Sequence, residues 1–184
     1  MLRKLLVITL LFGTVAAAYA QKKDRKKKKS KAKTEQAATD TAKIDYKAVG
    51  APLPPLELTT RTGEKLTDKD FRKHDNLLVM MFNPTCDHCQ EETTILEKNI
   101  DKFENTKIVL VAAPSMIEYL EFYNNVTRYS KYPAITVGVD SAGFIDKTFT
   151  YASLPQINIY NKDRKLVKIF SGVVQFDALE PYIK

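Results

Sequence analysis

The chain contains only two cysteines, Cys86 and Cys89, and two residues separate them. A thiolate attacks a disulfide to form a mixed disulfide, and a second thiol nearby can then attack that intermediate and release the product. Two thiols at this spacing therefore predict thiol–disulfide exchange. The chemistry depends on which thiol ionises, and so on the elements that hold the pair.

The cysteines follow an uninterrupted apolar run over residues 77–82, which is typical of a strand buried on both faces. A short loop with a proline comes next, and the amphipathic sequence after Cys89 predicts a helix with Glu91 and Glu92 in its first turn. Backbone N–H groups and the helix dipole stabilise an anion at such a helix start. We therefore expect Cys86 to be the nucleophile and Cys89 the resolving thiol of a redox-active disulfide.

Three other uses of a cysteine pair fit this chain less well. A zinc site needs two further ligands, and the chain offers no third cysteine and only two histidines, His74 and His88. Haem attachment needs a histidine directly after the second cysteine, where Gln90 stands. A purely structural disulfide across so short a loop would constrain the unfolded chain little. We therefore expect redox chemistry without a metal or a cofactor.

Residues 1–20 have the order of a secretory signal peptide. Arg3 and Lys4 precede an apolar run, small residues ending in Ala20 follow it, and we expect cleavage between Ala20 and Gln21. The alternative is an uncleaved anchor, but the apolar stretch is shorter than the roughly 20 residues needed to span a membrane. The sequence thus predicts an exported protein of the periplasm or cell envelope.

Residues 21–45 are expected to form a lysine-rich disordered linker. Residues 21–43 carry ten Lys or Arg against three acids and have no aromatic side chain, so they cannot bury enough surface to fold. Weak contact with an anionic membrane is a further expectation, since each basic residue near such a surface contributes roughly 1 kcal/mol. Nucleic-acid binding is not expected, because residues 44–184 carry seventeen basic against nineteen acidic residues.

The remaining chain, residues 46–184, has the patterns of one α/β domain. The expected elements are, in order, a hairpin over residues 56–66, a helical turn over 68–71, a strand over 77–82, a helix after Cys89, a strand over 108–113, a helix from Ser115 to about Asn125, a strand over 135–139, a hairpin over 156–170 and a helix from about Phe176. Ser115 is expected to begin its helix because Glu118 completes the spacing of a capping box. Parallel β-α-β units followed by a hairpin and a terminal helix predict a mixed sheet with helices on both faces.

The domain over residues 46–184 resembles the thioredoxin-fold proteins of the exported TlpA/ResA-type thiol-disulfide oxidoreductases. The resemblance rests on four stretches in the expected order: Gly50-Ala51-Pro52, Thr62-Gly63-Glu64-Lys65, Cys86-Asp87-His88-Cys89 and Leu154-Pro155. It implies an α/β, thioredoxin-like mixed β-sheet flanked by helices. It also implies an N-terminal β-hairpin extension and an α/β insertion before a cis-proline.

In this family the proline, here Pro155, is cis and packs beside the cysteines, and its neighbouring backbone receives the substrate chain. The resemblance therefore implies a substrate-binding role for Leu154, Pro155 and Thr85. The chain departs from its relatives in two places. Relatives usually carry an aromatic residue before the first cysteine, where this chain has Thr85, and thioredoxin carries a buried aspartate in the central strand, where this chain has Met80.

The two residues between the cysteines are expected to tune the redox couple. His88 can donate a hydrogen bond or a positive charge to the Cys86 thiolate, which stabilises the reduced form and makes the couple more oxidising. Asp87 either moves protons, as an acid there resembles what some exported relatives use, or is a solvated acid at the helix start. A resemblance to reductases and a histidine typical of oxidants leave the direction of electron flow open.

Together these features predict an exported thiol-disulfide oxidoreductase. Its expected partners are protein thiols or disulfides as substrate and an unidentified electron-transfer partner of the cell envelope. The alternative from another class is a non-catalytic thioredoxin-like binding module or metallochaperone, tethered by the lysine-rich linker. Turnover that depends on Cys86 would separate the two.

Overall fold

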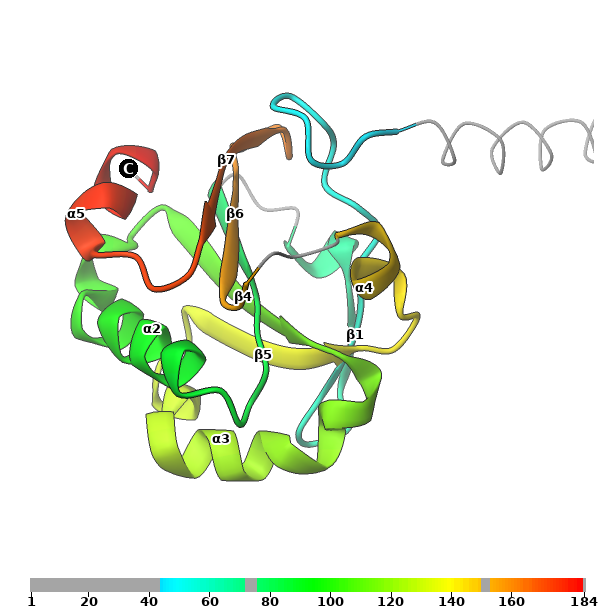
Figure 1. Cartoon of the computed structure of the whole chain (residues 1–184), viewed down its shortest axis with the longest axis vertical. Helices are drawn as coiled ribbons and strands as arrows, with labels where there is room; N and C mark the ends of the chain where they lie inside the picture. Colours follow the sequence, from blue (N-terminus) through cyan, green and yellow to red (C-terminus); the bar gives the residue numbers. More distant parts are fainter. Residues whose placement is uncertain (1–43, 72–75, 150–152, 184) are drawn as a thin grey trace, which may run out of the picture. The chain divides into compact units, whose positions relative to one another are not determined.

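Within residues 44–71, 76–149 and 153–183, which the computed structural model describes, seven strands form one mixed β-sheet in the order β2-β1-β5-β4-β3-β6-β7 (Figure 1). The strands are β1 (Glu57–Thr60), β2 (Lys65–Thr67), β3 (Asn76–Met81), β4 (Thr106–Ala112), β5 (Ile135–Asp140), β6 (Gln156–Tyr160) and β7 (Leu166–Ser171). The predicted signal peptide and the linker up to residue 43 lie outside the described residues.

The predicted central strand is β3, which lies between β4 and β6. Leu77–Met81 are all buried, as expected for a strand covered on both faces. β3, β4 and β5 run parallel, whereas β6 pairs antiparallel with β3 and β1 pairs antiparallel with β5. Parallel strands end at the same edge of a sheet, so the segments that follow β3 and β4 leave the sheet side by side.

The described helices lie on both faces of this sheet. They are α2 (Asp87–Lys98), α3 (Leu120–Thr127), α4 (Phe144–Thr148) and α5 (Phe176–Leu179), with 3-10 segments η1 (Asp68–Phe71), η2 (Ile100–Lys102), η3 (Pro114–Tyr119), η4 (Tyr129–Lys131) and η5 (Glu180–Tyr182). None of these helices is both long enough and apolar enough to cross a membrane.

Two apolar cores lie between the sheet and the helices, one on each face of the sheet. Leu96 of α2, Leu120 of α3 and Leu179 of α5 pack into the first core, on one face. Ile145 and Phe149, from α4 and the residue after it, pack into the second core, on the other face. Figure 1 shows α2 and α5 on one side of the sheet and α4 on the opposite side. The predicted mixed sheet with helices on both faces is therefore confirmed.

Both predicted hairpins are present. β1 and β2 pair antiparallel with Leu58 opposite Leu66, and Gly63 in their turn has a φ of 83°, which favours glycine. β6 and β7 form the C-terminal hairpin. These hairpins were predictable because alternating apolar residues and turn residues are local signals.

The prediction that a helix begins at Ser115 is wrong. Residues Pro114–Tyr119 form the 3-10 segment η3, and the α-helix α3 begins only at Leu120. The Met116 N–H donates to the Ala113 carbonyl at 2.9 Å, three residues back, so a tight turn satisfies the first donor without the Ser115 hydroxyl. Spacing alone does not distinguish a capping box from a 3-10 turn that leads into a helix.

Candidate active site

The thiol pair lies where β3 passes into α2. Asn83 shapes the turn, because its side-chain oxygen accepts hydrogen bonds from both the N–H and the hydroxyl of Thr85, each at 2.9 Å. Its carbonyl also accepts from the Cys86 N–H at 3.1 Å. Cys86 is the N-cap of α2, with extended backbone angles (φ −89°, ψ 120°). The first thiol therefore stands at the N-terminal end of the helix, where an anion is stabilised.

The two thiols have unequal surroundings. Both cysteines are free, Cys86 is partly exposed, and Cys89 is completely buried. Burial raises the pKa of the Cys89 thiol to about 12. A hydrogen bond from the Asn83 backbone opposes this rise, while the neighbouring Cys86 thiol and the Glu92 charge add to it. Cys89 is therefore protonated at neutral pH and needs a proton acceptor before it can attack.

Glu92 is a buried carboxyl group one helical turn beyond Cys89. Its side chain is 0% exposed, its Oε2 accepts a hydrogen bond from the Val174 N–H at 2.6 Å, and its Oε1 has no hydrogen-bond partner among the described residues. Burial raises the pKa of Glu92 to about 7, which the Val174 N–H opposes and the Glu91 charge supports. This carboxyl group can thus gain or lose a proton near neutral pH.

The sequence did not single out Glu92, because it was grouped with Glu91 as an acid of the first helical turn. Glu91 is exposed, whereas Glu92 faces the sheet. The available signal was the spacing of Cys89, Glu92 and Leu96, which lie three and four residues apart and so share one face of a helix. Met80 of β3 packs in the same core as Cys89. The buried carboxyl group of this site therefore comes from the helix and not from the central strand.

Tyr123 of α3 contacts the start of α2 through its hydroxyl group. It is completely buried, and its ring lies on Phe82 with a centroid distance of 4.6 Å. Its hydroxyl contacts the Thr93 hydroxyl and donates to the Cys89 carbonyl at 3.2 Å, and Thr93 donates to the same carbonyl at 3.0 Å. Burial raises the pKa of Tyr123 well above its usual value, so it stays a neutral donor. This contact fixes the backbone of Cys89 from the side of α3.

The predicted substrate-binding residues lie at the same edge of the sheet. The Leu154–Pro155 peptide bond is cis, and the Pro155 carbonyl accepts from the Gly172 N–H at 2.8 Å. Gln156, the next residue, pairs with Met81 at the end of β3, which places Pro155 beside the turn that carries the cysteines. Cys86 and Leu154 both pack against the first core.

Three further predicted site residues belong to the cysteine turn itself. Thr85, Asp87 and His88 are all exposed, and they stand immediately before or between the two cysteines. Gln90 also supports this turn, because its side-chain nitrogen donates to the Pro84 carbonyl at 3.0 Å. Exposed groups around a partly exposed thiol and a buried one leave a surface where a substrate disulfide can approach Cys86 from solvent.

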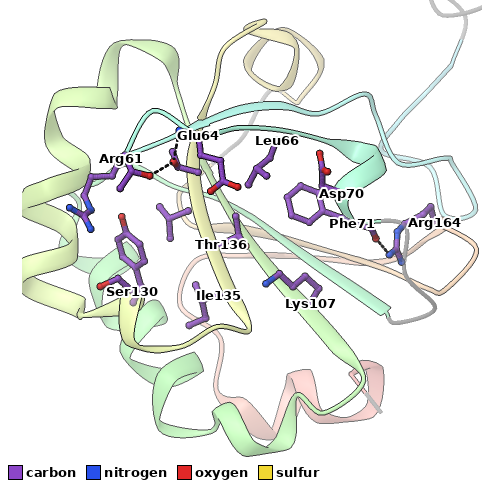
Figure 2. Close-up of a pocket in the computed structure, with 14 residues that line it drawn as sticks. Arg61, Glu64, Leu66, Asp70, Phe71, Lys107, Ser130, Ile135, Thr136 and Arg164 are labelled. Carbon is purple, nitrogen blue, oxygen red and sulfur yellow. Dashed lines mark hydrogen bonds between the residues drawn. The ribbon is translucent and has the colours of Figure 1, made fainter.

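A cavity of about 560 Å³ lies elsewhere, at the starts of β4 and β5 (Figure 2). Its three basic side chains are engaged within the protein. Arg61 pairs with Glu121 at 2.6 Å, Lys107 donates to the Pro133 carbonyl at 2.7 Å, and Arg164 donates to the Phe71 carbonyl. Since β3 carries the cysteines at its C-terminal end, this cavity is at the opposite edge of the parallel strands and is separate from the thiol pair.

Comparison with known proteins agrees with this geometry. No known protein-family model matches the chain. The thiol-disulfide oxidoreductase ResA of Bacillus cereus is 25% identical over 144 residues, covering 78% of this chain and 81% of that protein. The thioredoxin domain of a thiol-disulfide oxidoreductase from Bacteroides vulgatus superposes with a TM-score of 0.58 at 18% identity, covering 74% of this chain and 99% of that one.

A third similar protein is the pneumococcal exposed lipoprotein thioredoxin Etrx1 from Streptococcus pneumoniae, with a TM-score of 0.54 and 19% identity. The match covers 71% of this chain and 98% of that one. The fold is thus thioredoxin-like, and the predicted resemblance to the TlpA/ResA-type family is confirmed.

Proposed function

We propose that this thiol-disulfide oxidoreductase exchanges disulfides through Cys86 and Cys89. The Cys86 thiolate attacks one sulfur of a substrate disulfide, the substrate S–S bond breaks, and the other substrate sulfur leaves as a thiolate. Cys89, once deprotonated, attacks the Cys86 sulfur and expels the remaining substrate thiolate. The substrate gains two electrons, and the protein loses two electrons as the Cys86–Cys89 disulfide forms. The same steps in reverse oxidise a dithiol substrate.

This proposal rests on the difference in solvent exposure between the two thiols. Cys86 is partly exposed at a helix start, so it can meet an external disulfide. Cys89 is completely buried beside it, so it meets only a sulfur that is already attached to Cys86. This arrangement gives one thiol the role of nucleophile and the other the role of resolving thiol.

Glu92 supports the resolving step. Cys89 must lose a proton before it attacks, and its pKa of about 12 makes that loss costly without an acceptor. Glu92 has a pKa of about 7, lies on the same helical face, and its charge acts on the Cys89 thiol. We assign Glu92 the role of holding the proton that leaves Cys89, and of returning it when the disulfide is reduced.

The proposed substrates are protein thiols or disulfides in the periplasm or cell envelope. The predicted signal peptide over residues 1–20 and the similarity to an exposed lipoprotein thioredoxin support this location. Leu154, Pro155 and Thr85 would contact the substrate chain beside Cys86, with His88 and Asp87 tuning the couple. An envelope electron-transfer partner would restore the starting redox state.

Reduction of a disulfide-linked peptide by the full chain with a regenerating dithiol tests this function. Turnover should be present in the wild type, absent in Cys86→Ser and retained in Ser130→Ala, which changes a hydroxyl near the cavity at the other edge of the sheet. Activity that survives in Cys86→Ser would contradict the mechanism. Absence of turnover in the wild type would favour the non-catalytic binding module.

A further inference from the structure

Exposed apolar side chains gather on η3 and α3. Tyr119, Phe122 and Val126 are 46%, 48% and 48% exposed, and Ile117 just before them is 37% exposed. Residues 119, 122 and 126 lie three and four apart, so they share one face of the helical segment. These four residues are called the α3 ledge below. The two other exposed large apolar side chains among the described residues are Ile44 and Val49.

The α3 ledge is distinct from the face that attaches α3 to the sheet. Leu120, Tyr123 and Thr127 form the buried face, and Leu120 and Tyr123 pack in the first core. A surface helix normally carries polar residues outside its buried stripe. α3 instead has a second apolar face beside the first, and contiguous exposed apolar surface of this kind marks an interaction site.

The ledge lies on the flank of α3 away from Glu121, and α3 contacts the helix that follows Cys86. Glu121 marks the other flank, because it pairs at 2.6 Å with Arg61 in the turn between β1 and β2. β1 neighbours β5 on one side of the parallel strands, whereas α2 follows β3 on the other side. The Tyr123 hydroxyl reaches the Cys89 carbonyl, so α3 and the first turn of α2 are in direct contact, and Figure 1 shows these helices close together.

Acidic side chains border this surface. Glu118 is exposed and lies within this segment, whereas Glu121 is paired with Arg61 on the other flank of α3. The segment from Asn83 to Glu97 contains no Lys or Arg, and its exposed acids Asp87 and Glu91 stand on the first and second turns of α2. Glu118, Asp87 and Glu91 therefore give negative charge to the exposed side of η3 and of the start of α2. Such a surface favours a partner with an apolar anchor and positive charges around it.

We propose that the α3 ledge docks an apolar segment, flanked by Lys or Arg, of the protein whose thiol or disulfide reacts at Cys86. The inference rests on the proposed function, which requires a protein chain to lie beside Cys86, and on the contact between α3 and the first turn of α2. The chain's own residues 21–43 are basic but contain no Leu, Ile, Val, Met or aromatic residue to fill the ledge. They therefore do not match this surface.

The test uses three synthetic peptides, each with one cysteine held as a mixed disulfide with glutathione. The first has two leucines and a phenylalanine flanked by lysines, the second has serines for its apolar residues, and the third has glutamates for its lysines. The rate constant for reduction of each peptide is measured with the reduced full chain. The readout is the ratio of the rate constants for the first peptide and each of the others, which cancels general changes in thiol reactivity.

The wild type should prefer the first peptide over the second by about tenfold, or about 1.4 kcal/mol, because an aromatic side chain buried at an interface is a common source of binding energy. Phe122→Ser should lower that ratio at least about fivefold, and Glu118→Gln should lower the preference over the third peptide. Val49→Ser is the matched control, because it removes an apolar side chain that is 78% exposed outside the ledge, and it should keep both ratios. An unchanged ratio in Phe122→Ser would overturn the inference.

Two further measurements separate this inference from its alternatives. Binding of the first peptide, made without its cysteine and carrying a fluorophore, to Cys86→Ser/Cys89→Ser tests docking without any redox step. If the wild type reduces no peptide, the proposed function fails while this binding still decides whether the ledge docks the segment. Sedimentation of the wild type that shows a dimer abolished by Phe122→Ser would assign the ledge to a second copy of the chain and overturn the proposal.

Discussion

At the scale of single residues, the buried pair Cys89 and Glu92 defines how protons leave the site. Both side chains are completely buried on one face of α2. The pKa of Cys89 is about 12 and that of Glu92 is about 7, so Glu92 ionises first and is then able to accept the proton that Cys89 loses. A buried carboxyl group that titrates near neutral pH also makes folding depend on pH.

Stability should fall as the pH rises from about 4.5 to 7, because folding raises the Glu92 pKa from 4.5 to about 7. In this window the folded chain binds more protons than the unfolded chain, so the contribution is fully present below the unfolded pKa and lost above the folded one. Glu92→Gln should remove a dependence of up to about 1.4 kcal/mol per pH unit. Denaturant unfolding between pH 4 and 8 measures this.

Glu91→Gln is the matched control for that experiment. It neutralises the exposed neighbour and should leave most of the pH dependence in place. Glu97, whose pKa burial also raises to about 7, stays in every variant and contributes a background of the same sign. A wild type and a Glu92→Gln variant with parallel stability profiles would contradict the buried, titrating Glu92.

A second prediction for a single residue concerns the effect of His88 on the reduction potential. If His88 stabilises the Cys86 thiolate, replacing it by proline destabilises the reduced form and moves the reduction potential to more negative values. A loss of about 1.4 kcal/mol corresponds to about 30 mV for this two-electron couple. Residue 88 lies in the first turn of α2, where proline is tolerated. A glutathione redox titration with His88→Pro measures the change.

Asp87→Asn should shift the reduction potential in the opposite direction from His88→Pro. It removes a negative charge from the same turn and should move the potential to more positive values, because the thiolate then has one fewer repulsive neighbour. Equal potentials in the wild type and in His88→Pro would make the histidine a bystander.

At the scale of elements, the contact between α3 and α2 determines how firmly Cys89 is held. The Tyr123 hydroxyl and the Thr93 hydroxyl both donate to the Cys89 carbonyl, and the Tyr123 ring packs on Phe82. The segment containing α3 thus serves both as part of the core and as the support of the resolving cysteine. Its sequence gave no sign of this second role, because α3 and α2 meet only in the folded chain.

Tyr123→Phe should lower the free energy of unfolding by about 1 kcal/mol, the usual net contribution of one buried hydrogen bond. The ring and its contact with Phe82 remain, so the change isolates the hydroxyl. Tyr119→Phe is the control, because that side chain is 46% exposed and its hydroxyl removal should change stability by less than about 0.5 kcal/mol. Equal losses in the two variants would show that the Tyr123 hydroxyl has no special role.

The elements that could be predicted from the sequence are those with local signals. The apolar run of β3 and the alternating hairpins each contain their own pattern, and the structure places them as expected. η3 and the burial of Glu92 could not be predicted with the same reasoning. The first depends on a choice between two backbone turns of similar sequence, and the second on which face of α2 meets the sheet.

Some features of the candidate site could likewise be predicted from the sequence, and others could not. The spacing of Cys86 and Cys89 and their place between a strand and a helix are local features, and they were visible in the sequence. The closeness of Pro155 was expected only through the resemblance to a known family, since it depends on pairing of β6 with β3. Tyr123 and Glu92 were missed because their roles arise from packing.

At the scale of the whole molecule, export and redox chemistry must fit together. A protein that exchanges disulfides outside the cytoplasm must first cross a membrane, which is the expected role of residues 1–20. Mass spectrometry of the envelope fraction should find a mature chain that starts at Gln21. A predominant intact chain that begins at Met1 would contradict cleavage at Ala20.

The central claim is that Cys86 attacks and Cys89 resolves. Its most direct test is the intact mass of the reduced wild type, Cys89→Ser and Cys86→Ser after each reacts with glutathione disulfide at neutral pH. Cys89→Ser should accumulate one bound glutathione, and the wild type should end as an internal disulfide without an adduct. Cys86→Ser should remain free, because Cys89 is buried. A stable adduct on Cys86→Ser together with none on Cys89→Ser would contradict the assignment.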